Sequence, residues 1–404
     1  EGIKFMSGKS FYAAGLDAGS ERVRLVVCLL EDGRLRLVGR GDVPSAGWVK
    51  SRIADQGAVT ETMLAVLREA EASAGISLES VVVGVGGHLV RGANCRGILE
   101  FGHPREITQQ DVNRVIDRAR RVQLQEDRMV LQLFPQDFVV EHHPGHRDPR
   151  RMMASQLEVN VHLITASIQE HTCLLSAVHQ AHLSVEETVF EALAACYAAV
   201  LPEDRREGIA VVDIGAHSAD LVVYYGDSLQ LASTIPIGGD HFTRDVASGL
   251  RIGYDEALML KVQYGSATSE YTSDNSYVEI SGSGTREPRE APRRLLNQIL
   301  EARAQELFEH VYRELARVGM ERALIGGVVL TGGGANLSDL CDTAERVLGC
   351  QARKGLTIGI RDWPEELDDS TWTTAAGLAM YSAKLKVHSE IERQAAGLLG
   401  RILK

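Results

Sequence analysis

Three glycine-containing turns follow apolar segments of this chain, at residues 15–20, 213–218 and 331–336. Glycine lets a backbone approach a phosphate closely, and the N–H groups of such a turn donate hydrogen bonds to phosphate oxygens. A helix expected directly after Gly334 adds the partial positive charge of its N-terminus. The three turns together predict a cradle for phosphate groups.

Two of these turns carry an aspartate in the same place, Asp17 and Asp213. Mg²⁺ bound to a nucleotide takes carboxylates, or the waters that carboxylates hold, beside the phosphates. Across a cleft the two aspartates would face each other around one metal ion. Together with the third turn, they make a magnesium–nucleotide site the chemistry that these residue types favour.

The segments around both aspartates share one design. Residues 13–30 and 208–225 each read as a strand, an Asp-x-Gly turn and a second, β-branched strand. Their Val, Ile and Leu content is too high for surface strands, which predicts buried sheets. Two copies roughly 200 residues apart indicate an internally duplicated α/β protein with a cleft between its halves.

Further elements follow from periodicity and turn residues. A capping pattern near Glu106 to Thr108 opens a charged helix, and the block around it reads as a small inserted α/β unit. Residues 265–294 are polar and read as loops around one short strand. The expected elements are a strand at 81–90, a helix at 109–121, strands at 129–140, 157–165 and 277–280, a helix at 292–318, a strand at 323–331 and a helix at 336–346.

Composition limits the partners of the chain. The net charge of −12 argues against nucleic acid and against any general attraction to anionic lipid, so a membrane contact must be local. The six cysteines show no metal or disulfide spacing, which favours reduced thiols. No apolar run reaches the length of a membrane span.

The order of motifs resembles the superfamily of actin, sugar kinases and heat-shock chaperones. It comprises D-A-G-S, V-F-E-A-L-A, V-V-D-I-G, V-V-L-T-G-G-G and A-A-G-L-A. Segments 106–122, 133–141, 157–167 and 235–250 resemble the bacterial cell-division family FtsA in particular. The resemblance covers about residues 12–404. It implies an actin-like, ribonuclease H-like duplicated α/β fold, with two halves around a nucleotide cleft and an inserted small α/β subdomain.

The resemblance also implies subdomain boundaries. They are 11–91 plus 176–207 for subdomain 1A, 92–175 for the inserted subdomain 1C, 208–254 plus 326–385 for 2A, 255–325 for 2B, and 386–404 for a linker and a C-terminal amphipathic membrane helix.

ATP and Mg²⁺ are the ligands that the resemblance implies, with Asp17 and Asp213 at the metal. Glu191 matches a glutamate that positions water and metal near the γ-phosphate, which makes it catalytic with the two aspartates. A helix-start residue that favours the dipole is the alternative for Glu191. The implied nucleotide contacts are Asp17, Gly19, Ser20, Asp213, Gly215, Gly238, Gly239, Lys261, Gly332, Gly333 and Gly334.

Two departures from the family pattern bear on hydrolysis. The second phosphate turn usually reads D-I-G-G-G-T, whereas here Ala216, His217 and Ser218 follow Gly215. Leu258 stands where relatives carry a glutamate, three residues before Lys261. We therefore expect ATP binding with at most slow ATPase activity.

The C-terminal segment 391–404 has an apolar and a basic face at 100° per residue. A core helix is the alternative, but the terminal position, the basic face and two glycines favour a lipid surface. One such helix binds weakly, so attachment requires many copies, which a polymer supplies. The residues expected to contact the membrane are Leu398, Leu399, Arg401, Ile402, Leu403 and Lys404.

The FtsA resemblance implies filaments of the chain on the cytoplasmic face of the cell membrane at the division site. The chain would be a peripheral protein on anionic inner-membrane lipid that tethers FtsZ during septum formation. By position, Arg293, Arg294 and Arg303 would receive the FtsZ C-terminal tail, although an ordinary solvated helix face explains them equally well. Other division proteins would bind through 92–175.

Two other functions stay open. A pilus-assembly adaptor of the PilM type often has D-I-G-A in its second phosphate turn, as this chain does at 213–216, but lacks the terminal helix. A small-molecule kinase such as a sugar kinase needs a substrate motif with a catalytic base, and none stands out here.

Overall fold

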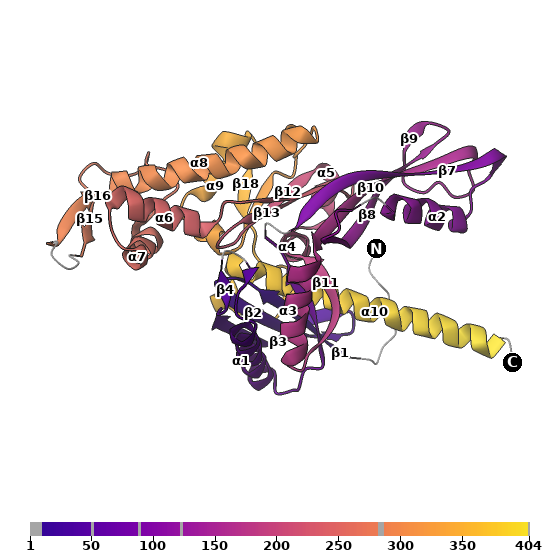
Figure 1. Cartoon of the computed structure of the whole chain (residues 1–404), viewed down its shortest axis with the longest axis horizontal. Coiled ribbons are helices and arrows are strands. Elements are labelled where there is room, and N and C mark those ends of the chain that lie inside the picture. The colour runs from indigo at the N-terminus through magenta and orange to yellow at the C-terminus, as the bar shows by residue number, and fades with distance from the viewer. Residues whose placement is uncertain (1–9, 50–51, 88–89, 122–123, 282–286, 403–404) are drawn as a thin grey trace. The chain divides into compact units, whose positions relative to one another are not determined.

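The computed structural model describes residues 10–49, 52–87, 90–121, 124–281 and 287–402, with side chains described as far as Arg393 (Figure 1). Its contacts divide the chain into two compact units. The first unit comprises Glu1–Val85, Glu170–Val200 and Gly355–Lys404, and the second comprises Gly86–Gln169 and Leu201–Lys354.

A six-stranded sheet forms the centre of the first unit, in the order β11-β6-β1-β2-β3-β19. β1 pairs antiparallel with β2 and parallel with β6. The apolar centres of β1, β2 and β6 are buried, as their composition predicts. The strands are β1 Phe11–Ala18, β2 Arg22–Glu31, β3 Arg34–Pro44, β6 Ser80–Val85, β11 Ser184–Phe190 and β19 Ile360–Arg361, and a separate hairpin contains β4 Trp48–Val49 and β5 Arg52–Ile53.

Helices cover both faces of this sheet. α1 (Gln56–Ala74) is capped by Asp55 and ended by Gly75 in the left-handed conformation, and it packs on β3. α4 (Glu191–Ala199) and α10 (Thr373–Ile402) cover the opposite face. The shorter elements here are α3 Ile168–Gln180 and the 3₁₀ turns η2 Glu365–Leu367 and η3 Ser370–Trp372.

The five-stranded sheet of the second unit repeats the plan of the first. Its order is β14-β13-β12-β17-β18, which corresponds strand for strand to β3-β2-β1-β6-β11. β12 pairs antiparallel with β13 and parallel with β17, as β1 does with β2 and β6. The duplication predicted from the two Asp-x-Gly segments is thereby confirmed. The strands are β12 Ile209–Ile214, β13 Ala219–Tyr225, β14 Ser228–Ile235, β17 Val328–Thr331 and β18 Ala352–Lys354.

A four-stranded antiparallel sheet with one helix is inserted in the sequence between β6 and β11 of the first repeat, which confirms the predicted inserted α/β unit. Its order is β7-β10-β8-β9. α2 (Gln109–Arg120) packs on it and begins with the expected capping box, formed by Thr108 and Asp111. The strands are β7 Arg91–Glu106, β8 Arg128–Val140, β9 His143–His146 and β10 Met153–Ser167.

The rest of the second unit packs helices on the five-stranded sheet. α8 matches the predicted long helix, and one apolar cluster joins it to the sheet. The predicted strand at 323–331 begins only at Val328, and the polar region contains a strand, β16, that the sequence does not predict. The elements are α5 Pro202–Glu207, α6 Gly239–Leu250, α7 Tyr254–Tyr264, β15 Tyr277–Ile280, β16 Arg289–Pro292, α8 Arg293–Arg317, the 3₁₀ turn η1 Gly333–Asn336 and α9 Leu340–Leu348.

The linker expected at 386–390 is helical, and α10 continues through it without a break. The segment contains no glycine or proline that would end a helix, and Val387 still packs beside Ala13 and Leu30. Beyond Val387 the helix extends away from the sheet of its own unit (Figure 1). None of the described helices is both long and apolar enough to cross a bilayer.

The expected subdomain boundaries stay predictions, because contacts divide the chain more coarsely. Residues 355–385 differ from the expectation. The resemblance implies subdomain 2A for them, but α10 packs on β1 and α4, which places this segment in the first unit.

Candidate functional site

The first phosphate turn lies between β1 and β2. Asp17 is the penultimate residue of β1, and the pair Ala18/Val23 closes the turn. A Cβ atom on Gly19 would lie 2.6 Å from the carbonyl oxygen of Arg22. Only glycine fits there without moving the backbone. The sequence prediction of a tight turn at Gly19 and Ser20 is therefore confirmed, and their contact with a nucleotide stays a prediction.

Asp17 lies opposite a cation within its own sheet. Its cross-strand partner is Arg24, and the partner of Arg24 on β3 is Asp42. The Arg24 Nε atom is 3.5 Å from Asp42 Oδ1, and the guanidinium lies 5.5 Å from the centre of the Trp372 ring. Register partners point to the same face of a sheet. Arg24 is therefore the neighbour of Asp17 on the same face of the sheet, and its guanidinium lies near Asp42 and Trp372.

Glu191 is brought close to Asp17 by the strand between them. It is the first residue of α4, directly after β11. A Cβ atom on Gly84 would lie 3.0 Å from Glu191 Cγ and 3.3 Å from its Oε1 atom. Gly84 follows Val83, which pairs with Leu16, so it lies beside Asp17. Two predicted site residues, Asp17 and Glu191, therefore lie close together in the first unit. Gly84, which lies between them, is not predicted from the sequence.

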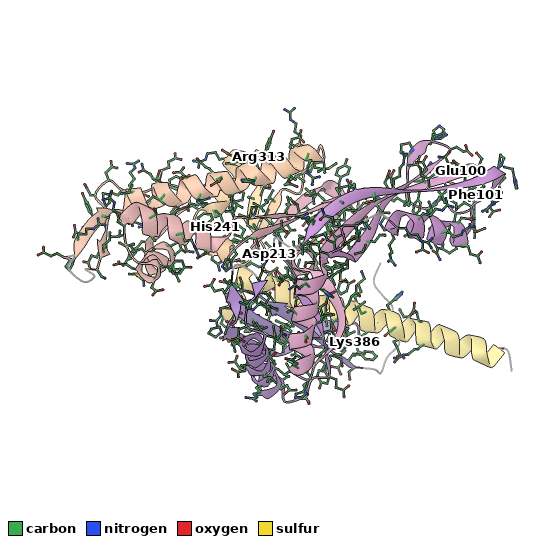
Figure 2. The ribbon with its side chains drawn as sticks, viewed as in Figure 1. Glu100, Phe101, Asp213, His241, Arg313 and Lys386 are labelled. Carbon is green, nitrogen blue, oxygen red and sulfur yellow. The ribbon has the colours of Figure 1, made fainter. Side chains whose placement is uncertain are left out.

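Four polar residues form a row across the second sheet, which we call the polar row: Thr234, Asp220, Asp213 and Thr331. Consecutive members are register partners on β14, β13, β12 and β17. Asp213, whose place is labelled in Figure 2, is 9% exposed, Asp220 is 4% exposed and Thr331 is fully buried. Within the described part of the chain, the Thr331 hydroxyl has no hydrogen-bond partner.

Asp220 is held from two sides. Its Oδ1 atom accepts a hydrogen bond of 2.6 Å from Thr234 Oγ1, and its Oδ2 atom accepts one of 3.0 Å from the N–H of Gly87. Burial raises the pKa of Asp220 to about 7, and the neighbouring charge of Asp213 also raises it, whereas the two hydrogen bonds lower it. A signal for Asp220 exists in the sequence, because it is a charged residue inside the apolar strand 219–225.

The raised pKa of Asp220 predicts a pH dependence of stability. The ordinary value is 3.8, so between about pH 4 and pH 7 the folded state binds more protons than the unfolded state. The contribution of Asp220 to stability is therefore full below pH 4 and is lost as the pH rises towards 7. An asparagine side chain resembles the neutral acid, so Asp220→Asn should lose less stability across this range than the unchanged chain. Urea denaturation without metal or nucleotide checks this, and parallel curves would contradict it.

The third phosphate turn touches the polar row. Gly332 has φ +78°, and a Cβ atom on it would lie 2.3 Å from Asp213 Oδ1. A Cβ atom on Gly334 would lie 2.3 Å from Ile214 Cγ2. Both glycines therefore let the third turn approach the second closely. Gly333 begins the 3₁₀ turn η1, and α9 starts only at Leu340, so the helix expected directly after Gly334 begins later.

The second phosphate turn packs against the start of α6, where the predicted residues Gly238 and Gly239 lie and Lys261 contacts Gly239. The N–H of Gly239 donates to Gly215 O at 2.9 Å, and that of Asp240 donates to Ala216 O at 2.8 Å. Lys261 Nζ donates to Gly239 O at 2.9 Å. These amides at the start of α6 are therefore used to fix the 215–218 turn. Gly238, Gly239 and Lys261 are expected from the sequence to contact the nucleotide, and the hydrogen bonds around the second turn are an additional finding.

The second unit suits a divalent cation beside phosphate. Asp213 and Asp220 are two buried carboxylates in register, and their mutual repulsion decreases when a cation binds. Because Gly332 has no side chain, only its backbone lies next to the Asp213 carboxylate on the side of the third turn. Asp213 would hold the metal, and the second and third glycine turns would hold phosphate oxygens. Asp17 and Glu191 belong to the first unit, where the first turn has the same local form.

The arginines predicted to receive the FtsZ tail have different surroundings. Arg293 Nε donates to Tyr264 O at 2.8 Å, and Arg294 forms an ion pair with Asp274. Arg303 forms two hydrogen bonds with Asp245, at 2.5 and 3.0 Å, which raise the pKa of its guanidinium. Arg303 is 22% exposed and Arg294 is 41% exposed. The Arg294 side chain is thus more accessible than that of Arg303.

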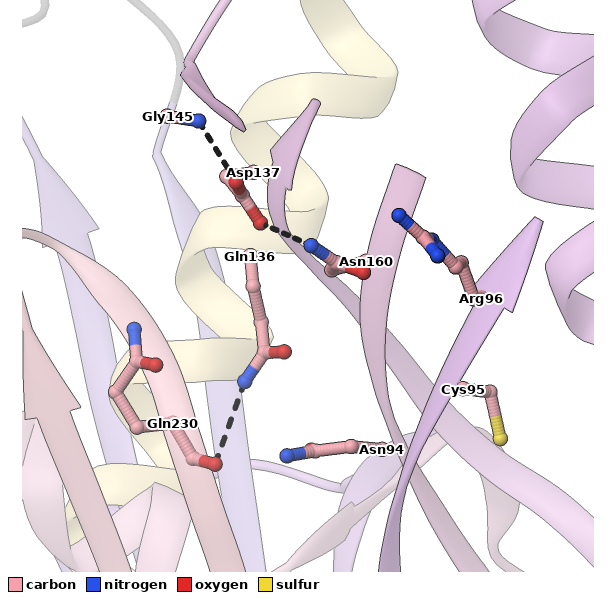
Figure 3. Close-up of a pocket in the computed structure, with 8 residues that line it drawn as sticks. All are labelled: Asn94, Cys95, Arg96, Gln136, Asp137, Gly145, Asn160 and Gln230. Carbon is pink, nitrogen blue, oxygen red and sulfur yellow. Dashed lines mark hydrogen bonds between the residues drawn. The ribbon is translucent and has the colours of Figure 1, made fainter. Parts of the chain in front are cut away.

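A cavity of about 520 Å³ lies where the small inserted sheet meets β14 (Figure 3). Gln136 Nε2 donates to the carbonyl oxygens of Leu229 and Gln230 on β14. Asp137 accepts hydrogen bonds from Gly145 N and Asn160 Nδ2, at 2.8 Å each. The lining is therefore polar and internally paired, and it is a separate feature from the polar row.

Comparison with known proteins decides the family. A model of "Cell division protein FtsA" matches residues 210–377, and a model of the "SHS2 domain inserted in FTSA" matches residues 87–165. The cell division protein FtsA of Pseudomonas aeruginosa is 32% identical to the chain over 377 residues, covering 93% of this chain and 89% of the relative. The chain belongs to the FtsA family.

Two solved structures are similar to the chain in fold. A PilM-PilN type IV pilus biogenesis complex has a TM-score of 0.65 at 17% identity, covering 92% of this chain and 98% of the other. MreB5 of Spiroplasma citri bound to ADP has a TM-score of 0.59 at 13% identity, covering 94% and 98%. These likenesses show an actin-like fold. FtsA membership gives the chain a role in cell division, so neither the PilM-type adaptor nor the sugar kinase is supported as its function.

Proposed function

We propose that the chain is an ATP-binding, actin-like cell-division protein that forms filaments on the cytoplasmic face of the membrane and tethers FtsZ there. The observation that carries the nucleotide part is the duplicated hairpin, with Asp17 and Asp213 at the same position in two sheets of matching strand order. The MreB5 structure with this fold is bound to ADP. Mg²⁺ would sit at the two aspartates, and it would supply the charge that neutralises the phosphates.

Slow hydrolysis follows from the second turn. Ala216 and His217 are larger than the glycines of the usual pattern, and the backbone amides of Gly239 and Asp240 are used in fixing this turn. Glu191 lies beside Gly84 and close to Asp17, where a carboxylate would orient a water for attack. Turnover would then depend on how far this turn lets the γ-phosphate approach.

Membrane attachment would come from the end of α10. The described residues 391–393 are exposed, and α10 reaches Ile402 beyond the last contact with its sheet. Of the predicted lipid contacts, the side chains of Leu398, Leu399, Arg401 and Ile402 lie outside the described ones, and Leu403 and Lys404 lie outside the described residues altogether. Each Å² of apolar surface that enters the lipid contributes about 25 cal/mol to the free energy of binding. Filaments would multiply this weak contact.

FtsZ would bind through an acidic C-terminal tail on α8. Arg293 and Arg294 begin this helix, and Leu295 beside them is 41% exposed, so charge and an apolar contact occur together. Arg303 would contribute if the tail displaced Asp245. Other division proteins would use the inserted domain, where the polar cavity beside β14 offers paired donors and acceptors.

Removing residues 391–404 is expected to abolish sedimentation of the full chain with anionic vesicles while leaving the fold intact. The truncation keeps Val387, through which α10 packs beside Ala13 and Leu30 in the first unit. Vesicle pelleting with Mg-ATP measures the loss, and electron microscopy on lipid monolayers shows whether filaments form. Equal sedimentation of the truncated chain would refute the anchor. Turnover of an added sugar would refute the function as a whole.

A further inference from the structure

One face of α10 carries four residues near the point where the helix leaves the sheet of the first unit, two of them before Val387 and two after it. Tyr381, Lys384, His388 and Ile391 are spaced three, four and three residues apart, which is the repeat of a single helix face. Lys384 is exposed, the His388 side chain is 74% exposed, and Ile391 is 51% exposed. This face of α10 therefore remains accessible on the first unit.

α4 adds an aromatic side chain to the same place. The rings of Tyr197 and Tyr381 are 5.6 Å apart and meet edge to face at 68°. Lys384 Nζ lies 5.2 Å from the centre of the Tyr197 ring and donates a hydrogen bond of 3.2 Å to its hydroxyl. We call Tyr197, Tyr381, Lys384 and His388 the α10 flank. Tyrosine and lysine are residue types that place an apolar body and a polar tip at a lipid–water boundary.

A second lysine nearby behaves differently. Lys386 Nζ forms an ion pair of 2.8 Å with Glu186 and donates a hydrogen bond of 2.6 Å to Tyr12 O. It lies two residues from Lys384, about 200° around the helix, and it is labelled in Figure 2. Among the described residues, no carboxylate lies within ion-pair distance of Lys384. The ammonium group of Lys386 is thus neutralised by a carboxylate of the same unit, whereas that of Lys384 contacts the uncharged Tyr197 side chain.

The α10 flank is in register with the predicted lipid contacts. α10 is continuous to Ile402, so no flexible segment separates the two parts. Positions 384, 391 and 398 are seven residues apart, as are 388, 395 and 402, and a seven-residue step returns a helix to the same side within about 20°. The lipid-facing positions expected from the sequence thus continue along the side that the α10 flank occupies.

We propose that the α10 flank is a second contact with an anionic lipid surface, so that the side of the first unit bearing Tyr197 and Lys384 lies on the membrane. The inference rests on the proposed anchor at 391–404. The ammonium group of Lys384 would pair with lipid phosphate, and the two tyrosines would sit at headgroup depth. The unbroken helix fixes the orientation of the unit on the membrane, which a flexible linker would leave open.

The first test compares two matched variants of the full chain, Lys384→Gln and Lys386→Gln. Binding is measured on vesicles of phosphatidylglycerol and phosphatidylcholine, and on phosphatidylcholine alone. Lys384→Gln should weaken binding to the anionic vesicles about fivefold, the loss expected for one basic residue at such a surface. Lys386→Gln should leave it unchanged, with thermal denaturation as the check on folding. Equal effects of the two variants, or none, would overturn the proposal.

The second test changes the register. Two alanines inserted after Ser389 turn the terminal segment by about 200°, whereas a seven-residue helical insertion restores the register within about 20°. When it is combined with each insertion, Lys384→Gln should weaken binding to anionic vesicles only in the seven-residue variant. A loss in both insertions, or in neither, would overturn the role of the rigid helix. If deletion of 391–404 leaves vesicle binding intact, the proposed anchor itself fails, whereas failure of the α10 flank alone shows as loss on deletion without an effect of Lys384→Gln.

Discussion

Replacing Asp213 by asparagine is expected to weaken the binding of Mg-ATP roughly 10- to 100-fold. Asp213 lies near the end of β12 as one of two adjacent buried carboxylates, and its removal takes away a full negative charge at the predicted metal position. Calorimetric titration with ATP in the presence of Mg²⁺ measures the change. An unchanged affinity would remove Asp213 from the site.

Two controls separate this effect from unfolding. Titration with ATP and a chelator should give similar affinities for both proteins, because the lost interaction runs through the metal. Without ligand, Asp213→Asn should be at least as stable as the unchanged chain, because the charge of Asp213 raises the pKa of Asp220 and thereby disfavours the ionised form. A marked fall in thermal stability would mean that Asp213 is needed for folding.

Replacing Gly377 by alanine is expected to destabilise the first unit by about 3 kcal/mol or more. A Cβ atom there would lie 1.8 Å from the carbonyl oxygen of Ala194, so α10 and α4 must separate. The same stretch of α10 touches β1 at Gly15, where an added Cβ would lie 2.2 Å from Ala379 N. Backbone atoms on both sides leave no flexible side chain to give way. Denaturant unfolding measures the loss.

The matched control is Gly57→Ala in α1. An added Cβ there meets only Asp55 Oδ1, at 3.4 Å, so no backbone has to move. Alanine is the better helix former, so the variant should be at least as stable as the unchanged chain. If Gly377→Ala were as stable as this control, α10 would not rest on α4 as the structure has it.

Local patterns predict the strands and turns well. Apolar runs that end in Asp-x-Gly indicate both hairpins, and Asp17 and Asp213 lie at the expected turns. The proximity of Asp220 and Thr331 to Asp213 escapes such reasoning, because it arises from the pairing of separate strands. The proximity of Glu191 to Asp17 likewise depends on Gly84, a residue on a third strand.

Segments with weak patterns are predicted less well. Residues 386–390 look like a linker because they are polar, yet they lack helix breakers and continue α10. β16 lies in a charged stretch whose strand character comes from pairing with β15. α9 begins later than its pattern suggests, because η1 takes the residues after Gly332. Strand pairing therefore decides the case of β16, whereas the lack of a helix breaker decides that of residues 386–390.

The two repeats share a strand order but differ in the charge of the residue that pairs with the aspartate of each turn. In the first, the register partner of Asp17 is Arg24, a residue of opposite charge on the same face of the sheet. In the second, the partner of Asp213 is Asp220, so two carboxylates lie side by side, and binding of a cation or a proton lowers their mutual repulsion. The second half of the duplicated fold should therefore respond more strongly to protons and cations than the first half does.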